Sequence, residues 1–344
     1  MKRALIVLLS LAVAGGLFAQ VSFSGSVLGG VEVAIQDDTT FSAYHTDSGV
    51  GYRFELNANY TNDDGNAGIF ARLRYNGAID GGTPAHVWFK PTDTLWLYGG
   101  RIDANRWGTF GGFDSGGDVG SPIGVHLRLD PVPGLSLGAG VAPNGGEVAD
   151  ASYRFGLRYT SSGVFDAAAN LNYNGSTEVT NVNAGVNILA LSGIGLTRLA
   201  VDVAANDITD LAWIGVGPRI GFSVAGLSGE VRSQIYLPMN DDNELDTAVQ
   251  VFGQYPIGSV TARLGVGFEL KGSFKSPTGS FDPREWDALQ KSITTGTDPM
   301  VVVYPSLAFN IGGGSITAAY SLQTLLADEA TTRHAIYLAF NRGF

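Results

Sequence analysis

The side chains that most often carry chemistry are few in this 344-residue chain and lie far apart. Its four histidines stand at positions 45, 86, 126 and 334, whereas a zinc site built on a local motif needs ligands a few residues apart. The chain has no cysteine, which excludes disulfides and thiolate metal ligands. A lipase acting at a membrane would need a serine and a histidine that face lipid, and His126 falls on the polar side of its segment. The sequence therefore predicts no enzyme activity, no metal site and no cofactor.

The acidic run at residues 241–246 is the strongest remaining candidate for a metal site. An EF-hand loop spaces its oxygen ligands at alternate positions and has a glycine at its sharp turn, and this run has neither feature. We expect an acidic loop in contact with water. The chain has 21 Lys and Arg against 32 Asp and Glu, a net charge of −11, which disfavours nucleic acid as a partner.

A set of arginines provides the clearest chemical pattern. Each lies on the polar side of a segment in which apolar and polar residues alternate. In residues 50–60, for example, the even positions are apolar and the odd positions are glycine or polar. Successive side chains of a β-strand point to opposite faces, so each segment is predicted to be a strand with its arginine on the polar face. The arginines in this set are Arg53, Arg72, Arg74, Arg128, Arg154 and Arg158.

The length of these segments indicates what covers their apolar faces. They run to about ten residues, which matches the ~9–11 residues of a tilted transmembrane strand and exceeds the ~5–6 of most soluble strands. Tyrosine or tryptophan stands near their ends, as in the aromatic girdles of membrane barrels. A soluble β-sandwich would also alternate, but a chain of this length could not expose so many apolar faces to water. In lipid the sheet must close, because an open edge leaves backbone groups unpaired. We therefore predict an all-β, single-domain, transmembrane antiparallel up-and-down β-barrel.

Turn sequences divide the chain into strands. Short turns alternate with longer polar segments, the first of them at 37–47 and the longest at 272–299, which is typical of outer-membrane barrels. The pattern predicts eighteen strands, or sixteen if the short strand at 84–90 and the division near 175–176 are absent. Either number is even, so both chain ends are expected on the periplasmic side. The eighteen strands are predicted to begin near residues 21, 48, 67, 84, 94, 122, 135, 151, 164, 177, 194, 211, 227, 245, 259, 300, 315 and 331.

Residues 1–19 predict a signal peptide. Lys2 and Arg3 precede an apolar stretch that is shorter than the ~20 residues of a membrane-spanning helix. Cleavage is expected near residues 19 and 20, which leaves residues 20–344 as the barrel. The protein is therefore expected to be exported through the periplasm to the cell outer membrane.

Two segments resemble known families. The chain ends in Phe344, with Phe340, Leu338 and Ile336 in the same register, which resembles the C-terminal assembly signal of bacterial outer-membrane proteins, although Arg342 departs from it. The segment 95–101, with sequence LWLYGGR, is similar to the fifth strand of the general porins.

The resemblance to porins has consequences for the glycine-rich segment 103–121. It implies that this loop folds into the barrel and narrows it, with Asp103, Asp114 and Asp118 facing the wall arginines. It also implies a homotrimer, on the resemblance alone.

These features predict an outer-membrane porin, surrounded by lipid, for passive diffusion of small hydrophilic solutes and ions. Two alternatives stay open. One is a substrate-selective porin for a sugar or an organic anion, guided by Trp96, Trp107, Phe110 and Phe113. The other is a surface adhesin or structural barrel without channel activity.

Overall fold

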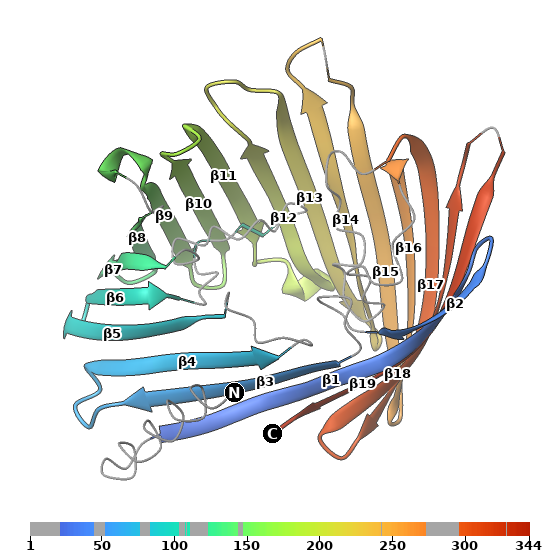
Figure 1. Cartoon of the computed structure of the whole chain (residues 1–344), viewed down its shortest axis with the longest axis horizontal. Helices are drawn as coiled ribbons and strands as arrows, with labels where there is room; N and C mark the ends of the chain where they lie inside the picture. The colour runs from blue at the N-terminus through green and yellow to red at the C-terminus, as the bar shows by residue number, and fades with distance from the viewer. Residues whose placement is uncertain are drawn as a thin grey trace.

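The computed structural model describes residues 21–44, 52–75, 83–102, 107, 109–110, 123–143, 147–241, 243–272, 296–327 and 329–344. Within them, one 19-stranded sheet is formed in which neighbouring strands are antiparallel. The sheet closes on itself because the first strand, β1 (Val21–Ile35), pairs with the last, β19 (Thr331–Gly343), as Figure 1 shows. The closed antiparallel barrel predicted from the sequence is therefore confirmed.

The remaining strands follow in chain order around the barrel. They are β2 (Thr39–Tyr44), β3 (Tyr52–Thr61), β4 (Ala67–Tyr75), β5 (Ala85–Thr92), β6 (Leu95–Arg101), β7 (Gly124–Val132), β8 (Leu135–Ala142), β9 (Ser152–Ser161), β10 (Phe165–Asn174), β11 (Val179–Ile188), β12 (Leu196–Ala205), β13 (Trp213–Val224), β14 (Leu227–Pro238), β15 (Asp246–Ile257), β16 (Val260–Gly272), β17 (Asp298–Ile311) and β18 (Gly314–Leu325). Two short 3₁₀ helices, Val148–Asp150 and Ser192–Ile194, lie in connections. In the part of the chain that the structure describes, no helix has the length and apolar character needed to cross a membrane.

The nineteen strands fill eighteen positions around the barrel. Both β2 and β3 pair with β1, β2 along residues 30–35 and β3 along residues 21–29, so together they occupy one position. The two features on which the sixteen-strand alternative depended are both present, because β5 is formed and β10 and β11 are separate strands. Eighteen is therefore the number predicted from the sequence.

The first hairpin differs from the prediction of a polar loop over residues 37–47. The chain turns tightly between Ile35 and Thr39 and forms β2, and the strand predicted to begin near 48 begins at Tyr52 as β3. Threonine and phenylalanine in β2 favour extended backbone, and β1 is long enough to pair with them beyond the end of β3. Tertiary pairing thus converts a polar segment into part of the wall.

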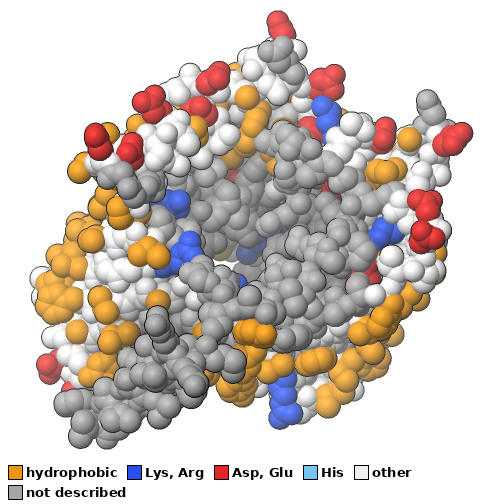
Figure 2. Space-filling view, in the orientation of Figure 1, with side chains coloured by type: hydrophobic (Ala, Val, Ile, Leu, Met, Phe, Trp, Pro, Cys, Tyr) orange, Lys and Arg blue, Asp and Glu red, His pale blue; other side chains and the backbone are white. Residues whose placement is uncertain are grey.

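The two faces of the sheet differ as the alternation predicts. On β9, Phe155, Leu157 and Tyr159 are 52%, 43% and 39% exposed, whereas their neighbour Arg158 lies on the opposite face. Exposed apolar side chains continue around the outside of the barrel, where Figure 2 shows them as an orange band. Such an apolar surface is suited to contact with lipid rather than water.

The two ends of the barrel differ in their connections. At one end the strands are joined by short turns, such as Ala225-Gly226 between β13 and β14. Their φ angles of 51° and 85° are the left-handed values that a two-residue hairpin of the matching twist requires. The longer connections join the strands at the other end, which is called the long-loop end below, and residues 103–106, 111–122 and 273–295 of these connections lie outside the described residues.

The face assignment predicts unequal costs for charges on opposite sides of the wall. Leu157→Arg places a guanidinium against lipid and is expected to destabilise the barrel by ~2–4 kcal/mol. Asn183→Arg, on the inner face of β11, loses a hydrogen bond to Asn170 (3.2 Å) and should cost only about 1 kcal/mol. Urea unfolding in lipid vesicles, followed by tryptophan fluorescence, measures both. Equal destabilisation by the two variants would contradict the assignment.

Candidate solute pathway on the inner wall

The strand registers place the arginines predicted from the sequence on the inner face of the barrel. Cross-strand partners share a face, and Arg72 and Arg74 of β4 lie opposite Asn57 and Glu55 of β3. The other positions follow from the pairings of β3, β7, β8 and β9. The six arginines predicted from the sequence that lie on the inner face are Arg53, Arg72, Arg74, Arg128, Arg154 and Arg158.

One carboxylate serves two arginines on β4. Glu55 Oε1 lies 3.3 Å from Arg72 Nε, and Glu55 Oε2 lies 3.0 Å from Arg74 Nη2. Arg72 Nε also donates a hydrogen bond to Asn57 Oδ1 at 2.8 Å. Because two guanidinium groups share one carboxylate, this part of the wall carries a formal positive charge.

The arginines farther around the wall pair with acids on their own or a neighbouring strand. Arg128 pairs with Asp130 on β7, and Arg158 pairs with Asp166 of β10. Together with Glu55, these are the acids on the inner face of β3 to β10, so arginines outnumber carboxylates there. Partly exposed pairs of this kind contribute at most about 1 kcal/mol each to stability. Their main effect is on the potential that a passing solute meets.

The net negative charge of the chain is concentrated elsewhere, at the rim of the long-loop end. Figure 2 shows acidic side chains along this rim. In the connection after β12, Thr209 Oγ1 donates a hydrogen bond to Asp207 at 2.6 Å, which holds the pKa of that carboxyl below its usual range. Exposed carboxylates in the described connections at this end are Asp37, Asp38, Glu147, Glu178, Asp210, Asp241, Glu244 and Glu329.

A short piece of the segment after β6 lies against the inner wall. The side chain of Trp107 is 2% exposed, and its indole Nε1 donates to the Ser136 carbonyl at 3.3 Å. Asn170 Nδ2 donates to the Trp107 carbonyl at 3.2 Å, and the Phe110 amide donates to Asp202 Oδ1 at 2.9 Å. Strands β8, β10 and β12 therefore each hold this piece by one hydrogen bond.

Two glycines make room for the Trp107 ring. A Cβ atom on Gly138 would lie 2.5 Å from Trp107 Cζ2, and one on Gly156 would lie 2.5 Å from Trp107 Cγ. These glycines are direct cross-strand partners on β8 and β9. The indole thus covers a strip of wall that has no side chains of its own.

This arrangement corrects one expectation from the sequence. Trp107 was expected to help guide solutes, but a side chain that is 2% exposed cannot contact them. Phe110 instead stacks under the guanidinium of Arg158, whose Cζ lies 5.1 Å from the ring centre. Asp103, Asp114, Asp118 and Phe113 lie outside the described residues.

The residues that hold this piece were not among those predicted from the sequence. Two features of the sequence point to them. Gly138 and Gly156 each stand at an inner position of a predicted strand, where a missing side chain leaves space for another group. Asp202 is an acid within the apolar run 199–205 of β12, and it is fully buried in the structure. A buried carboxylate needs a hydrogen-bond donor, which here is a backbone amide of the folded-in segment.

The letters of a hydrolase motif occur once in this wall, and the structure explains why they carry no catalytic signal. Residues 134–138 read Gly-Leu-Ser-Leu-Gly, a Gly-x-Ser-x-Gly pattern. A nucleophilic serine of that type stands on a sharp turn between a strand and a helix. Ser136 instead lies within the regular strand β8 and is buried beneath the Trp107 indole.

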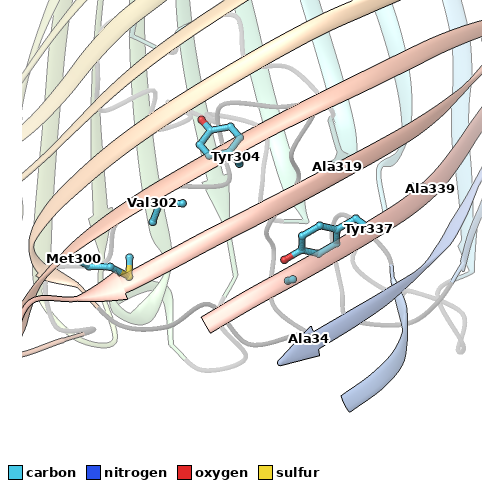
Figure 3. Close-up of a cluster of buried hydrophobic side chains, with 8 residues drawn as sticks. Ala34, Met300, Val302, Tyr304, Ala319, Tyr337 and Ala339 are labelled. Carbon is cyan, nitrogen blue, oxygen red and sulfur yellow. The ribbon is translucent and has the colours of Figure 1, made fainter. Parts of the chain in front are cut away.

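The wall on the other side of the barrel has a closely packed cluster on its inner face. The cluster includes Met300, Val302 and Tyr304 of β17 and Tyr337 of β19, drawn in Figure 3. Beside it, Arg333 donates to Glu32 Oε1 at 2.5 Å, and the two side chains are 4% and 1% exposed. The inner face therefore differs around the barrel, with partly exposed arginines on β3 to β10 and buried, closely packed side chains on β17 to β19.

Filling the glycine strip should dislodge Trp107. Gly156→Ala is expected to destabilise the barrel by about 1–3 kcal/mol, because backbone and a packed ring must move apart. The matched control is Gly99→Ala on β6, where the new Cβ would meet only Val87 at an ordinary 3.6 Å. In a Trp107→Gly background, which also removes the Trp107 Cβ that would lie 2.8 Å from the new methyl group, the cost of Gly156→Ala should largely disappear. Urea unfolding of the four variants measures this cycle, and a mild Gly156→Ala would contradict the packing.

Comparison with known proteins supports the fold. No protein-family model and no curated protein sequence matches the chain. Among solved structures, Pseudomonas aeruginosa OpdL has a TM-score of 0.61 at 12% identity, covering 95% of this chain and 99% of its own. Acinetobacter baumannii OccAB4 has a TM-score of 0.56 at 10% identity, covering 95% and 99%. The outer membrane protein OpdK of Pseudomonas aeruginosa has a TM-score of 0.58 at 9% identity, covering 95% and 100%. The chain therefore shares its closed-barrel fold, almost end to end, with bacterial outer-membrane proteins, as its resemblance to that class predicts.

Proposed function

We propose that the protein is an outer-membrane channel through which small hydrophilic solutes and ions diffuse passively. The observation that carries the proposal is a closed barrel of eighteen positions whose inner face is arginine-rich over β3 to β10. Small eight-stranded barrels are filled by their side chains, whereas barrels of about sixteen to eighteen strands leave an aqueous channel. Arginine and asparagine on the inner wall favour water there over a dry core.

The proposed location and orientation follow from the ends of the chain. Residues 1–19 would direct export, and the C-terminal phenylalanine would mark the chain for assembly in the outer membrane. The start of β1 and the end of β19 lie at the short-turn end, where Gly25 and Phe344 exchange two backbone hydrogen bonds of 3.0 and 2.9 Å. This end would face the periplasm, and the acidic rim would face outward. A homotrimer is supported by the resemblance to porins alone, and no reaction is part of the proposal.

The segment 103–121 would set the size limit of the channel. Its described piece at Trp107, Thr109 and Phe110 is held on the inner wall, which supports an inward path for the segment. Asp103, Asp114 and Asp118 would then stand across the opening from the arginines. A substrate-selective channel is the second candidate. It is favoured by five partly exposed rings on the inner face of β4, β5 and β6.

Planar-bilayer recording of the purified barrel tests the proposal. We expect stepwise conductance that falls as neutral sugars of increasing size are added, until a size is reached that no longer enters. A barrel that inserts in the bilayer and never conducts would overturn the channel proposal and favour an adhesin or structural barrel.

The wall charges should set the ion preference of the channel. Changing Arg72 and Arg74 together to Gln is expected to shift the reversal potential toward cations, because charged side chains at a narrowing select ions. Glu55→Gln should shift it the opposite way, since both arginines lose their shared carboxylate. The shifts should be large in a gradient near 0.1 M salt and small near 1 M, where the screening length falls from ~10 to ~3 Å. Unchanged reversal potentials at low salt would exclude these residues from the narrow part.

A further inference from the structure

Five rings form a continuous strip on the inner face of β4, β5 and β6. They are Phe70, His86, Trp88, Trp96 and Tyr98, and the set is called the aromatic strip below. Phe70 lies directly opposite His86, and Trp88 lies directly opposite Tyr98. All five are partly exposed, unlike Trp107. Leaving aromatic rings in contact with water costs free energy. A group of partly exposed rings on a polar wall therefore indicates a binding surface.

The rings are packed against one another along the strip. The centres of Phe70 and His86 are 5.4 Å apart, and those of His86 and Tyr98 are 5.8 Å apart. Trp88 covers Gly68 of the neighbouring strand, where a Cβ atom would lie 2.5 Å from the indole Nε1. Only glycine at this position leaves room for the indole against the wall, and the Trp88 side chain remains partly exposed.

Cations stand at both ends of the aromatic strip. At the long-loop end, Arg72 Cζ lies 5.7 Å from the centre of Phe70. At the short-turn end, Arg128 Cζ and Lys90 Nζ lie 4.1 and 5.1 Å from the ring of Trp96, and they form ion pairs with Asp130 and Asp93. At the rise of a β-strand, the six residues between these ends correspond to roughly 20 Å. The strip is therefore a track of rings along the barrel with net positive charge at its long-loop end, where Arg72 and Arg74 share Glu55.

Amide side chains border the track on the third strand. Asn59 of β3 lies directly opposite Phe70, and Asn57 lies opposite Arg72. Asn59 is exposed on the inner face. An amide offers both a donor and an acceptor, so this border is suited to hydroxyl groups.

These features together define a ligand. The negative face of an aromatic ring attracts the electropositive C–H groups of a sugar ring or the edge of another aromatic ring. The net positive charge of Arg72 and Arg74 at the long-loop end favours a carboxylate, and the amides favour hydroxyl groups. A ring that carries both groups satisfies all three parts of the track, whereas a bare aromatic acid leaves the amides without a partner.

We infer that the aromatic strip binds acidic sugars, namely hexuronates and their short oligomers, and guides them along the wall. The inference rests on the proposed channel function and deepens it. Stacking on Phe70 and Trp88 supplies affinity for the ring, and the two arginines that share Glu55 beside Phe70 hold its carboxylate. Because contacts repeat along the strip, a solute can move from one ring to the next without losing all of them at once.

Current block in a planar bilayer tests the inference with sodium digalacturonate as the probe. We expect brief, saturable interruptions of the current at about 0.1 M salt. Maltose, a neutral disaccharide of similar size, should block with at least about tenfold lower affinity because it lacks carboxylates. Benzoate should also block more weakly than digalacturonate. If benzoate blocks more tightly, the assignment to sugars is wrong, and if digalacturonate and maltose block equally, the role of the cations is wrong.

Variants of the strip separate stacking from a general effect of charge. Phe70→Ala and Trp88→Ala should each weaken the digalacturonate block by about tenfold, the loss expected when one stacking face is removed. The matched control is Phe89→Ala, next to Trp88 on β5 but 49% exposed on the outer face, which should leave the block unchanged. Unchanged block in both strip variants would overturn the inference.

A second readout keeps this test independent of conduction. Digalacturonate titrated into the detergent-solubilised barrel should change the tryptophan fluorescence, and Trp88→Ala should remove most of that change. A barrel that never conducts but shows this binding would contradict the channel proposal and leave the site standing. A barrel that conducts but shows neither block nor binding would contradict the site and leave the channel standing.

Discussion

The pairing of the first strand with the last is the interaction on which the rest of the structure depends. Ten residues of β1, from Ser26 to Ile35, lie opposite residues 334–343 of β19. Without this pairing, two strand edges would expose their amide and carbonyl groups to lipid, at several kcal/mol for each unsatisfied group. Closure also requires an even number of positions, because antiparallel neighbours must alternate all the way round. The shared position of β2 and β3 on β1 is what keeps that number at eighteen.

Closure turns the order of the sequence into the arrangement of the inner wall. In an up-and-down barrel, strands that are consecutive in the chain are neighbours in space, so a local change in composition becomes a sector of the lumen. Strands β3 to β10 supply six arginines and the five partly exposed rings, whereas β17 to β19 supply Met300, Val302 and the buried tyrosines. The difference between these two parts of the inner wall therefore follows from the order of the strands in the chain. It becomes a property of a passage only when β1 and β19 pair and close the barrel.

Glycine performs a second task in this wall besides forming turns. Trp88 lies over Gly68, Trp107 over Gly138 and Gly156, and Tyr304 over Gly265, where a Cβ atom would be 2.0 Å from the phenol ring. In each case a large ring on one segment occupies the space that a side chain on a neighbouring strand would take. These four glycines therefore let large rings pack against the wall, whereas others, such as Gly226, form its hairpins.

The sequence by itself determined the barrel, the number of positions and the face of each arginine, because alternation and turn residues are local properties. Contacts between distant segments were decided only by the tertiary structure. The sequence neighbourhood of Trp107 predicts a solute contact, and only the pairing of β8 with β9 forms the glycine strip that buries it. The buried pair of Glu32 and Arg333 joins positions 301 residues apart, and neither residue had a signal in its own strand. The same holds for the aromatic strip, since Phe70 and Trp96 belong to different hairpins. The alternation of apolar and polar residues determines which face of the sheet a side chain is on. Only strand register and barrel closure determine which other side chains it contacts.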